Sequence, residues 1–163
     1  RSTVLKNVLT GRLSKVSTIR SIFGLWPKDQ KQMAFEALNQ VEILEKAYVR
    51  ASNLSGGQQQ RVGIARALSQ KPKVMLADEP VASLDPITSR VVMSYLKKIN
   101  KELGITTIVN LHFLDLAKEF GDRLIGLRDG ELVYDGKVDD VSDKDFENIY
   151  GRSIKQSDLI GND

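Results

Sequence analysis

The chain has 163 residues, of which 41% are hydrophobic and 28% charged, a composition that indicates a globular protein with a core and excludes a disordered chain. It contains no cysteine, which excludes disulfides and thiolate metal sites, and its sequence has no apolar run near the ~20 residues that span a bilayer. The formal net charge of +3 comes from dispersed rather than clustered basic residues, a pattern that disfavours nucleic acid as a partner.

The first part of the chain shows the period of amphipathic helices. Apolar residues recur at helical spacing over 4–9, and again over 34–41 after Pro27, which suits the first turn of a helix. Residues 53–57 interrupt this pattern. A third helix is then expected to run to about Ser69.

The second part alternates strands with helices. The apolar run Val74–Ala77 predicts a parallel strand buried on both faces, and residues 105–111 predict a second buried strand. Between them, Asp85 is expected to cap a helix that starts at Pro86 and ends at Gly104. This strand–helix–strand order predicts an α/β fold.

A hairpin and a short helix complete the predicted elements. Strands over 123–127 and 131–134 flank the turn Arg128-Asp129-Gly130. Ser142 is expected to cap a short helix, and the polar tail beyond that helix is expected to fray.

The segment Leu54–Gln58 opens the third predicted helix with a serine and two glycines. Glycine lets a phosphate approach the backbone, and the unpaired N–H groups of a helix start attract anions, so this loop could grip the terminal phosphate of a nucleotide. The alternative is a serine-capped helix after a flexible turn.

Acidic residues and a histidine are expected at one sheet edge. Asp78 and Glu79 end the first strand, where they could hold Mg²⁺ through water and polarise an attacking water; the alternative is an ordinary acidic turn. His112 follows the second strand, with a structural histidine as its alternative. Segment Ser83–Asp85 lies between them and is also explained by helix capping alone.

The order and spacing of these motifs resemble the ABC ATPase family. The resemblance extends from about Val4 to Tyr150, and it implies the C-terminal part of an ABC-type P-loop NTPase: a helical subdomain plus a partial parallel-sheet catalytic core. The expected division is a helical subdomain with the signature helix at 1–71, part of a RecA-like core at 72–140, and a C-terminal helix and tail at 141–163.

The resemblance also implies roles around ATP and Mg²⁺. Leu54–Gln58 would be the ABC signature, Val74–Glu79 the Walker B strand and Ser83–Asp85 the D-loop. Asp78 would hold Mg²⁺ through water. The implied catalytic residues are Glu79, as general base, and His112, as the switch histidine on the γ-phosphate of the ATP in its own subunit.

The signature residues would act across a homodimer. Ser55, Gly56, Gly57 and Gln58 would close on the ATP held by the partner subunit, and Asp85 would help to align the two halves there.

Four segments resemble the ATP-binding subunits of phosphonate importers: 4–13 (VLKNVLTGRL), 54–68 (LSGGQQQRVGIARAL), 77–86 (ADEPVASLDP) and 123–136 (RLIGLRDGELVYDG). The first and last carry the resemblance to this subfamily, whereas the middle two are common to many importers. Such a subunit would lie on the cytoplasmic face of the membrane as a peripheral protein. Its partners would be membrane permease subunits and, indirectly, a substrate-binding protein. The alternatives are a soluble ABC-type ATPase of repair or translation and a non-catalytic regulatory module.

The sequence has no Gly-x-x-x-x-Gly-Lys-Ser/Thr motif, the Walker A loop that cradles phosphates. Because the chain begins at Arg1 rather than Met, an upstream segment is expected. The 163-residue chain alone is expected neither to bind ATP tightly nor to hydrolyse it.

Overall fold

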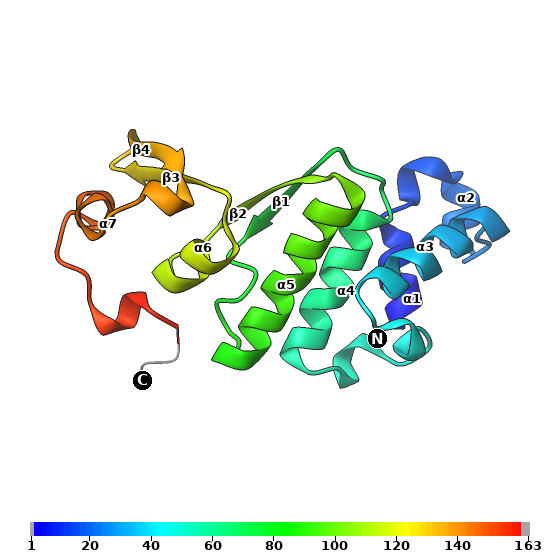
Figure 1. Cartoon of the computed structure of the whole chain (residues 1–163). Helices are drawn as coiled ribbons and strands as arrows, with labels where there is room; N and C mark the ends of the chain where they lie inside the picture. Colours follow the sequence, from blue (N-terminus) through cyan, green and yellow to red (C-terminus); the bar gives the residue numbers. More distant parts are fainter. Residues whose placement is uncertain (1, 161–163) are drawn as a thin grey trace.

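A computed structural model describes residues 2–160, so the expected ranges 1–71 and 141–163 each include residues outside this description (Figure 1). The elements in chain order are α1 (Val4–Thr10), α2 (Thr18–Ile22), α3 (Lys28–Gln40), α4 (Gly56–Leu68), β1 (Val74–Asp78), α5 (Pro86–Leu103), β2 (Thr106–Asn110), α6 (Leu114–Phe120), β3 (Arg123–Arg128), β4 (Glu131–Lys137) and α7 (Asp143–Tyr150). Within residues 2–160, no helix has both the length and the apolar character needed to cross a membrane.

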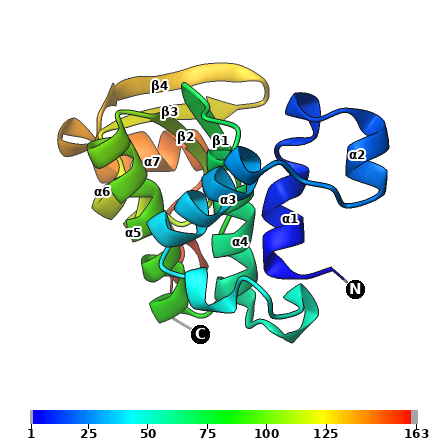
Figure 2. The ribbon, with the colours of Figure 1, turned by 90° about the vertical axis from the view of Figure 1, so that its right-hand side faces the viewer.

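Helices α1, α3 and α4 pack side by side as the predicted helical part (Figure 2). The apolar stripes meet in a common core, in which Val8, Leu38 and Ala65 are fully buried. The three predicted helices are confirmed. Pro27 caps α3 from the position before the first turn rather than within it, because the helix begins at Lys28.

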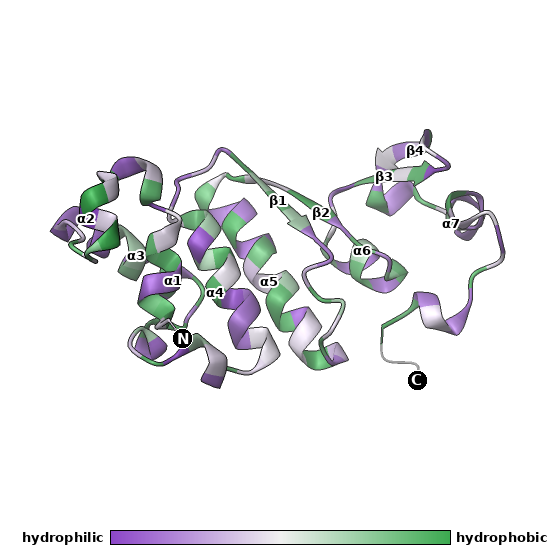
Figure 3. Ribbon diagram, turned by 180° about the vertical axis from the view of Figure 1, so that it is seen from behind, coloured by the Kyte–Doolittle hydropathy of each residue, from purple (hydrophilic) through white to green (hydrophobic). Residues whose placement is uncertain are grey.

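Strands β1 and β2 form a two-stranded parallel sheet, and α5 connects them. Asp85 accepts a hydrogen bond from the backbone N–H of Thr88 at the start of α5, Pro86 occupies its first turn, and Gly104 ends it in a left-handed conformation. Figure 3 shows hydrophobic and hydrophilic residues alternating along α4 and α5, as expected for helices that cover a core on one side. The strand–helix–strand prediction is confirmed.

The predictions that Val74–Ala77 is buried on both faces and that 105–111 forms a second buried strand are wrong as to burial. Met75 faces the core and is 4% exposed, whereas Leu76 is 75% exposed and Ile108 is 55% exposed. Successive residues of a strand point to opposite faces. Helix α5 packs on one face of the sheet, and no element within 2–160 covers these apolar residues on the other.

The hairpin is confirmed, with a tighter turn than predicted. Arg128 belongs to β3, so the turn consists of Asp129 and Gly130, both with positive φ (54° and 82°). Two central residues with positive φ match the twist of antiparallel strands, which explains the Asp-Gly pair. Ser142 caps α7 as predicted, in a reciprocal capping box with Asp145.

The tail after α7 does not fray over the part that the structure describes, so that prediction is wrong. Arg152 donates two hydrogen bonds to Asp158, at 2.8 and 2.7 Å, and the Asp158 side chain is buried. The backbone N–H of Ile160 donates to Asp115 Oδ1 at 3.0 Å. The polar composition of the tail concealed a specific ion pair within the tail and a backbone hydrogen bond that joins the tail to α6.

This ion pair predicts an acid-sensitive tail. Hydrogen bonds from Arg152 lower the pKa of Asp158 to about 2, from an ordinary value of 3.8. A carboxyl whose pKa is lower in the folded than in the unfolded chain stabilises the fold at any pH above its unfolded pKa. This contribution is lost as the pH falls from about 4 towards 2. Asp158→Asn should therefore accelerate amide exchange in residues 152–160 at neutral pH and flatten its dependence on pH below about 4. The exposed Asp139→Asn should change neither, and equal effects of the two substitutions would contradict the prediction.

Candidate functional site

The ends of β1 and β2 bring the predicted acidic pair and histidine to one rim of the sheet. Asp78 and Asn110 are register partners, and Asn110 Nδ2 donates to Asp78 Oδ1 at 2.8 Å. The backbone N–H of Glu79 donates to the carbonyl of Asn110 at 3.1 Å, which extends the pairing by one residue. This pairing fixes the Asp78 and Glu79 backbone beside the strand that leads to His112.

Glu79 and His112 face each other across the rim. His112 Nδ1 lies 3.7 Å from Glu79 Oε1, and the two side chains are 47% and 51% exposed. Both groups are therefore accessible to a ligand from solvent. Glu79 has φ 43°, a left-handed conformation that is costly for a residue with a Cβ. Such strain is held by the surrounding structure and is typical of functional positions.

The predicted D-loop is a compact turn between this rim and α5. The Ala82 N–H donates to the Glu79 carbonyl at 3.3 Å, and the Leu84 N–H donates to the Val81 carbonyl at 3.1 Å. Hydrogen bonds from Thr88 lower the pKa of Asp85 below its ordinary value. The Asp85 carboxylate is therefore charged at neutral pH and is occupied in capping its own helix.

The predicted signature loop starts α4 with a capping box. The Gln58 N–H donates to Ser55 Oγ at 3.4 Å, and the Ser55 N–H donates to Gln58 Oε1 at 3.0 Å. Each of the two side chains thus accepts from the backbone N–H of the other residue, and neither bonds the Glu79–His112 rim. The first N–H groups of a helix lack intrahelical acceptors, so the start of α4 retains donors for an anion.

The two glycines of this loop allow α4 to approach the D-loop and α5. A Cβ at Gly57 would lie 2.3 Å from Thr88 Cγ2, and one at Gly56 would lie 2.9 Å from Leu84 Cδ2. The sequence interpretation assigned these glycines to phosphate approach and missed this packing contact. Gly57 is buried, so close packing is sufficient to explain why this position requires glycine.

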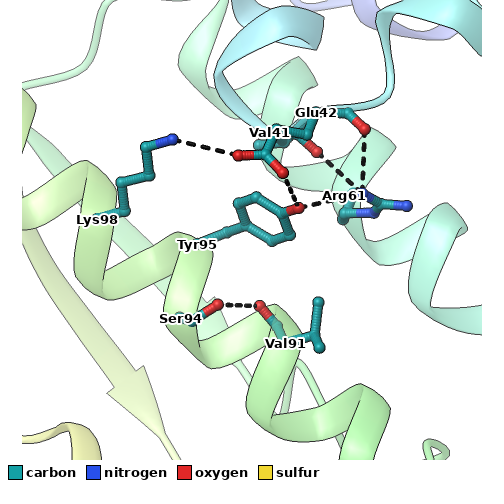
Figure 4. Close-up of polar contacts among 7 residues, drawn as sticks. All are labelled: Val41, Glu42, Arg61, Val91, Ser94, Tyr95 and Lys98. Carbon is teal, nitrogen blue, oxygen red and sulfur yellow. Dashed lines mark hydrogen bonds and ion pairs between the residues drawn. The ribbon is translucent and has the colours of Figure 1, made fainter.

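A polar cluster that sequence reasoning missed joins α4 to the turn after α3 (Figure 4). Arg61 Nη1 donates to the carbonyls of Val41 and Glu42, at 3.3 and 3.1 Å. It also donates to Tyr95 Oη at 3.2 Å, and its guanidinium lies 5.5 Å from the centre of the Tyr95 ring. Arg61 therefore links three elements from its position three residues beyond the signature loop.

Tyr95 and Lys98 of α5 complete this cluster by contacting the Glu42 carboxylate. Tyr95 Oη donates to Glu42 Oε2 at 3.0 Å, and Lys98 Nζ lies 3.4 Å from Glu42 Oε1. The hydrogen bond from Tyr95, together with Lys98, lowers the pKa of Glu42. Glu42 has φ 53°, a left-handed conformation that a helical sequence pattern does not reveal. The weak signal for the cluster in the sequence was an Arg, a Tyr and a Glu on otherwise apolar elements.

The rim suits a magnesium ion that shares its ligands with phosphates. Asp78 and Glu79 supply carboxylate oxygens, which Mg²⁺ prefers, and Mg²⁺ commonly binds through one or two carboxylates, waters and substrate phosphates. Within residues 2–160, no group of three or more Asp, Glu, His or Cys residues is placed to form a metal site. The donor set therefore fits a phosphate-dependent magnesium site better than a protein cage.

A carboxylate pair and a facing histidine at the carboxyl end of parallel strands, where ligands bind in open α/β sheets, are typical of the nucleotide-binding class of α/β proteins. Residues 1–82 match the sequence model described as ABC transporter. The chain belongs to the ABC transporter family.

Two bacterial relatives are similar along almost all of the chain. It is 60% identical over 161 residues to "Phosphonates import ATP-binding protein PhnC 3" of Halalkalibacterium halodurans, and 63% identical over 161 residues to "Phosphonates import ATP-binding protein PhnC 1" of Oceanobacillus iheyensis. Each match covers 99% of this chain but only 62% of the relative, so the chain spans less than two thirds of their length.

A solved structure shows the same fold. It is titled "Dimeric structure of a post-hydrolysis state of the ATP-binding cassette MJ0796 bound to ADP and Pi", and it matches with a TM-score of 0.65 and 38% identity. The match covers 83% of this chain and 56% of that one. The predicted fold class, part of an ABC-type nucleotide-binding cassette, is confirmed.

Proposed function

We propose that this chain is the signature and Walker B part of an ATP-hydrolysing subunit that drives an ABC importer, with phosphonates as the cargo. The observation that carries the ATPase proposal is the approach of Glu79 to His112 at 3.7 Å beside Asp78. The phosphonate proposal is supported by the 60–63% identity to two proteins named for phosphonate import. ATP is the proposed substrate, and Mg²⁺ is the proposed metal.

Each rim residue has a separate task in this proposal. Glu79 accepts a proton from the attacking water, since its exposed carboxylate stands at the strand end where ligands reach such sheets. His112 donates a hydrogen bond to the terminal phosphate from the opposite side. Asp78, oriented by Asn110 at 2.8 Å, would hold Mg²⁺ through water. Bound Mg²⁺ would neutralise phosphate charge during transfer.

The start of α4 serves a second nucleotide in a homodimer. The backbone N–H groups of Gly56 and Gly57 and the Ser55 hydroxyl face the ATP of the partner subunit. Gln58 and Asp85 act through the helix caps that they form, at 3.0 Å from their backbone partners, rather than through free side chains. The dimeric state of the solved cassette supports this arrangement.

The division into a helical subdomain, part of a RecA-like core and a C-terminal helix with tail follows the change of element type along the chain. In an importer, this subunit would bind permease subunits at the cytoplasmic face of the membrane as a peripheral protein. A substrate-binding protein would contribute indirectly. The proposal includes no contact with nucleic acid.

A chimera tests the proposed function. This chain would replace the matching 161 residues of the Oceanobacillus iheyensis relative, in a host whose own phosphonate ATPase gene is deleted. Growth on methylphosphonate as the sole phosphorus source is the expected result. If the purified chimera hydrolyses ATP but the host does not grow, the proposal that phosphonates are the cargo is overturned. If the chimera folds but does not hydrolyse ATP, the proposal of ATPase activity is overturned.

A further inference from the structure

The C-terminal end of α7 is bonded to the backbone of His112. Tyr150, the last residue of α7, donates from its hydroxyl to the His112 carbonyl at 2.7 Å. Thirty-eight residues separate the two in sequence. The Tyr150 side chain is partly buried, and burial raises the pKa of its phenol. The phenol is therefore protonated at neutral pH, as a donor must be.

The tail holds Tyr150 from its other side. The Arg152 guanidinium lies 5.2 Å from the centre of the Tyr150 ring and is itself held by Asp158 through two hydrogen bonds. A cation above an aromatic face is attractive, and the ion pair fixes where that cation stands. The ring of Tyr150 is thus supported by a residue that the folded tail orients.

A second contact joins the tail to the segment after His112. The Ile160 N–H donates to Asp115 Oδ1 at 3.0 Å, while the other Asp115 oxygen binds Arg90 of α5 at 3.2 Å. Asp115 is three residues from His112, so α7, the tail and α5 all hold the short segment that carries the histidine. We call Tyr150, Arg152, Asp158 and Ile160 the tail brace.

We propose that the tail brace positions His112, with Tyr150 as a positioning residue that acts through the His112 backbone. A hydrogen bond to the carbonyl restricts the His112 peptide unit, and with it the direction of the Cα–Cβ bond that carries the imidazole. The segment has lost its sheet partner by this point, because β2 ends at Asn110. Any effect of the tail brace on turnover rests on the proposed role of His112 in ATP hydrolysis. The positioning of His112 by the tail brace does not depend on that role.

The test uses Tyr150→Phe in the 163-residue chain, which removes the hydroxyl and keeps the ring. His112 is the only histidine, so its imidazole signals in an NMR spectrum are unique. We expect these signals and the amide signals of residues 111–114 to shift and broaden. Tyr134→Phe is the matched control, because Tyr134 also donates to a backbone carbonyl, that of Lys137 at 3.2 Å.

The outcomes distinguish a local effect of the Tyr150 hydroxyl on His112 from a general effect of substitution on the fold. Unchanged His112 signals in Tyr150→Phe, or the same change in Tyr134→Phe, would overturn the proposal. Loss of dispersed signals throughout the chain would also overturn it, because the hydroxyl is assigned a local role. Arg152→Gln leaves the hydroxyl in place and should give a smaller change at the same signals; no change would remove the tail from the brace.

Turnover is then measured in the chimera. Tyr150→Phe should lower kcat and leave KM for ATP within about 2-fold, since the hydroxyl is expected to affect His112 geometry rather than nucleotide affinity. If the unsubstituted chimera is inactive while the NMR changes are present, the proposed function fails and the brace stands. If the chimera is active and kcat is unaffected by Tyr150→Phe, the role of the brace in turnover is overturned.

Discussion

Replacing Glu79 with glutamine is expected to lower kcat of the chimeric ATPase by about 10²–10⁴-fold, the usual contribution of a general base. Glutamine keeps the length of the side chain but has no basic carboxylate with which to accept the proton of the attacking water. The backbone hydrogen bond from Glu79 to Asn110 involves no side-chain atom, so the strand end should persist. Steady-state kinetics with ATP as the varied substrate measure the loss.

Nucleotide affinity provides the internal comparison. Glu79→Gln should retain ATP binding, because the side chain acts on water rather than on the nucleotide. Glu102→Gln, an exposed substitution near the end of α5, is the matched control and should leave kcat unchanged. If kcat of the Glu79→Gln variant is within a few-fold of kcat of the unsubstituted chimera, Glu79 is not the general base.

Gly57→Ala is expected to reduce the free energy of unfolding of the 163-residue chain by about 1–3 kcal/mol, the usual cost of overpacking. The added methyl would meet Thr88 Cγ2 at 2.3 Å, a distance that requires the Thr88 side chain or one of the two helices to shift. Urea denaturation followed by circular dichroism measures the loss. Gly57 lies in the predicted signature loop, so the substitution measures how much of the need for this glycine comes from packing.

Two further variants isolate the steric cause. Gly63→Ala lies on the same helix with nothing within 4 Å of the new Cβ, and it should raise the free energy of unfolding by about 0.4–1 kcal/mol. Thr88→Ser removes the clashing methyl and keeps the hydroxyl, so it should recover most of the loss when combined with Gly57→Ala. An additive double variant would show that Thr88 is not the obstacle.

The elements near the site could be predicted because each has a strong local signal. Asp85 and Gly104 bound α5 by capping chemistry, and Asp129-Gly130 defines a hairpin turn through positive φ. The convergence of Asp78 and His112 followed from topology, since parallel strands end at a common edge. A periodic pattern and a strand order therefore sufficed to assemble the rim.

Burial and long-range polar contacts could not be predicted in the same way. An apolar run such as Val74–Ala77 records how hydrophobic a strand is, not which neighbours cover it, and Leu76 is 75% exposed. The bond from Tyr150 to the His112 carbonyl depends on a backbone acceptor, which every residue possesses. Arg152 and Asp158 formed an ion pair where composition indicated only a polar tail.

The cluster around Arg61 couples α4 and α5 so that the two helices are expected to move together. The two helices are joined midway by Arg61 and Tyr95, which both bond Glu42, and at their first turns by the fit of Gly57 against Thr88. A rotation of either helix must then carry the other with it. A displacement of the helical part would therefore move the start of α4 and the turn before α5 together.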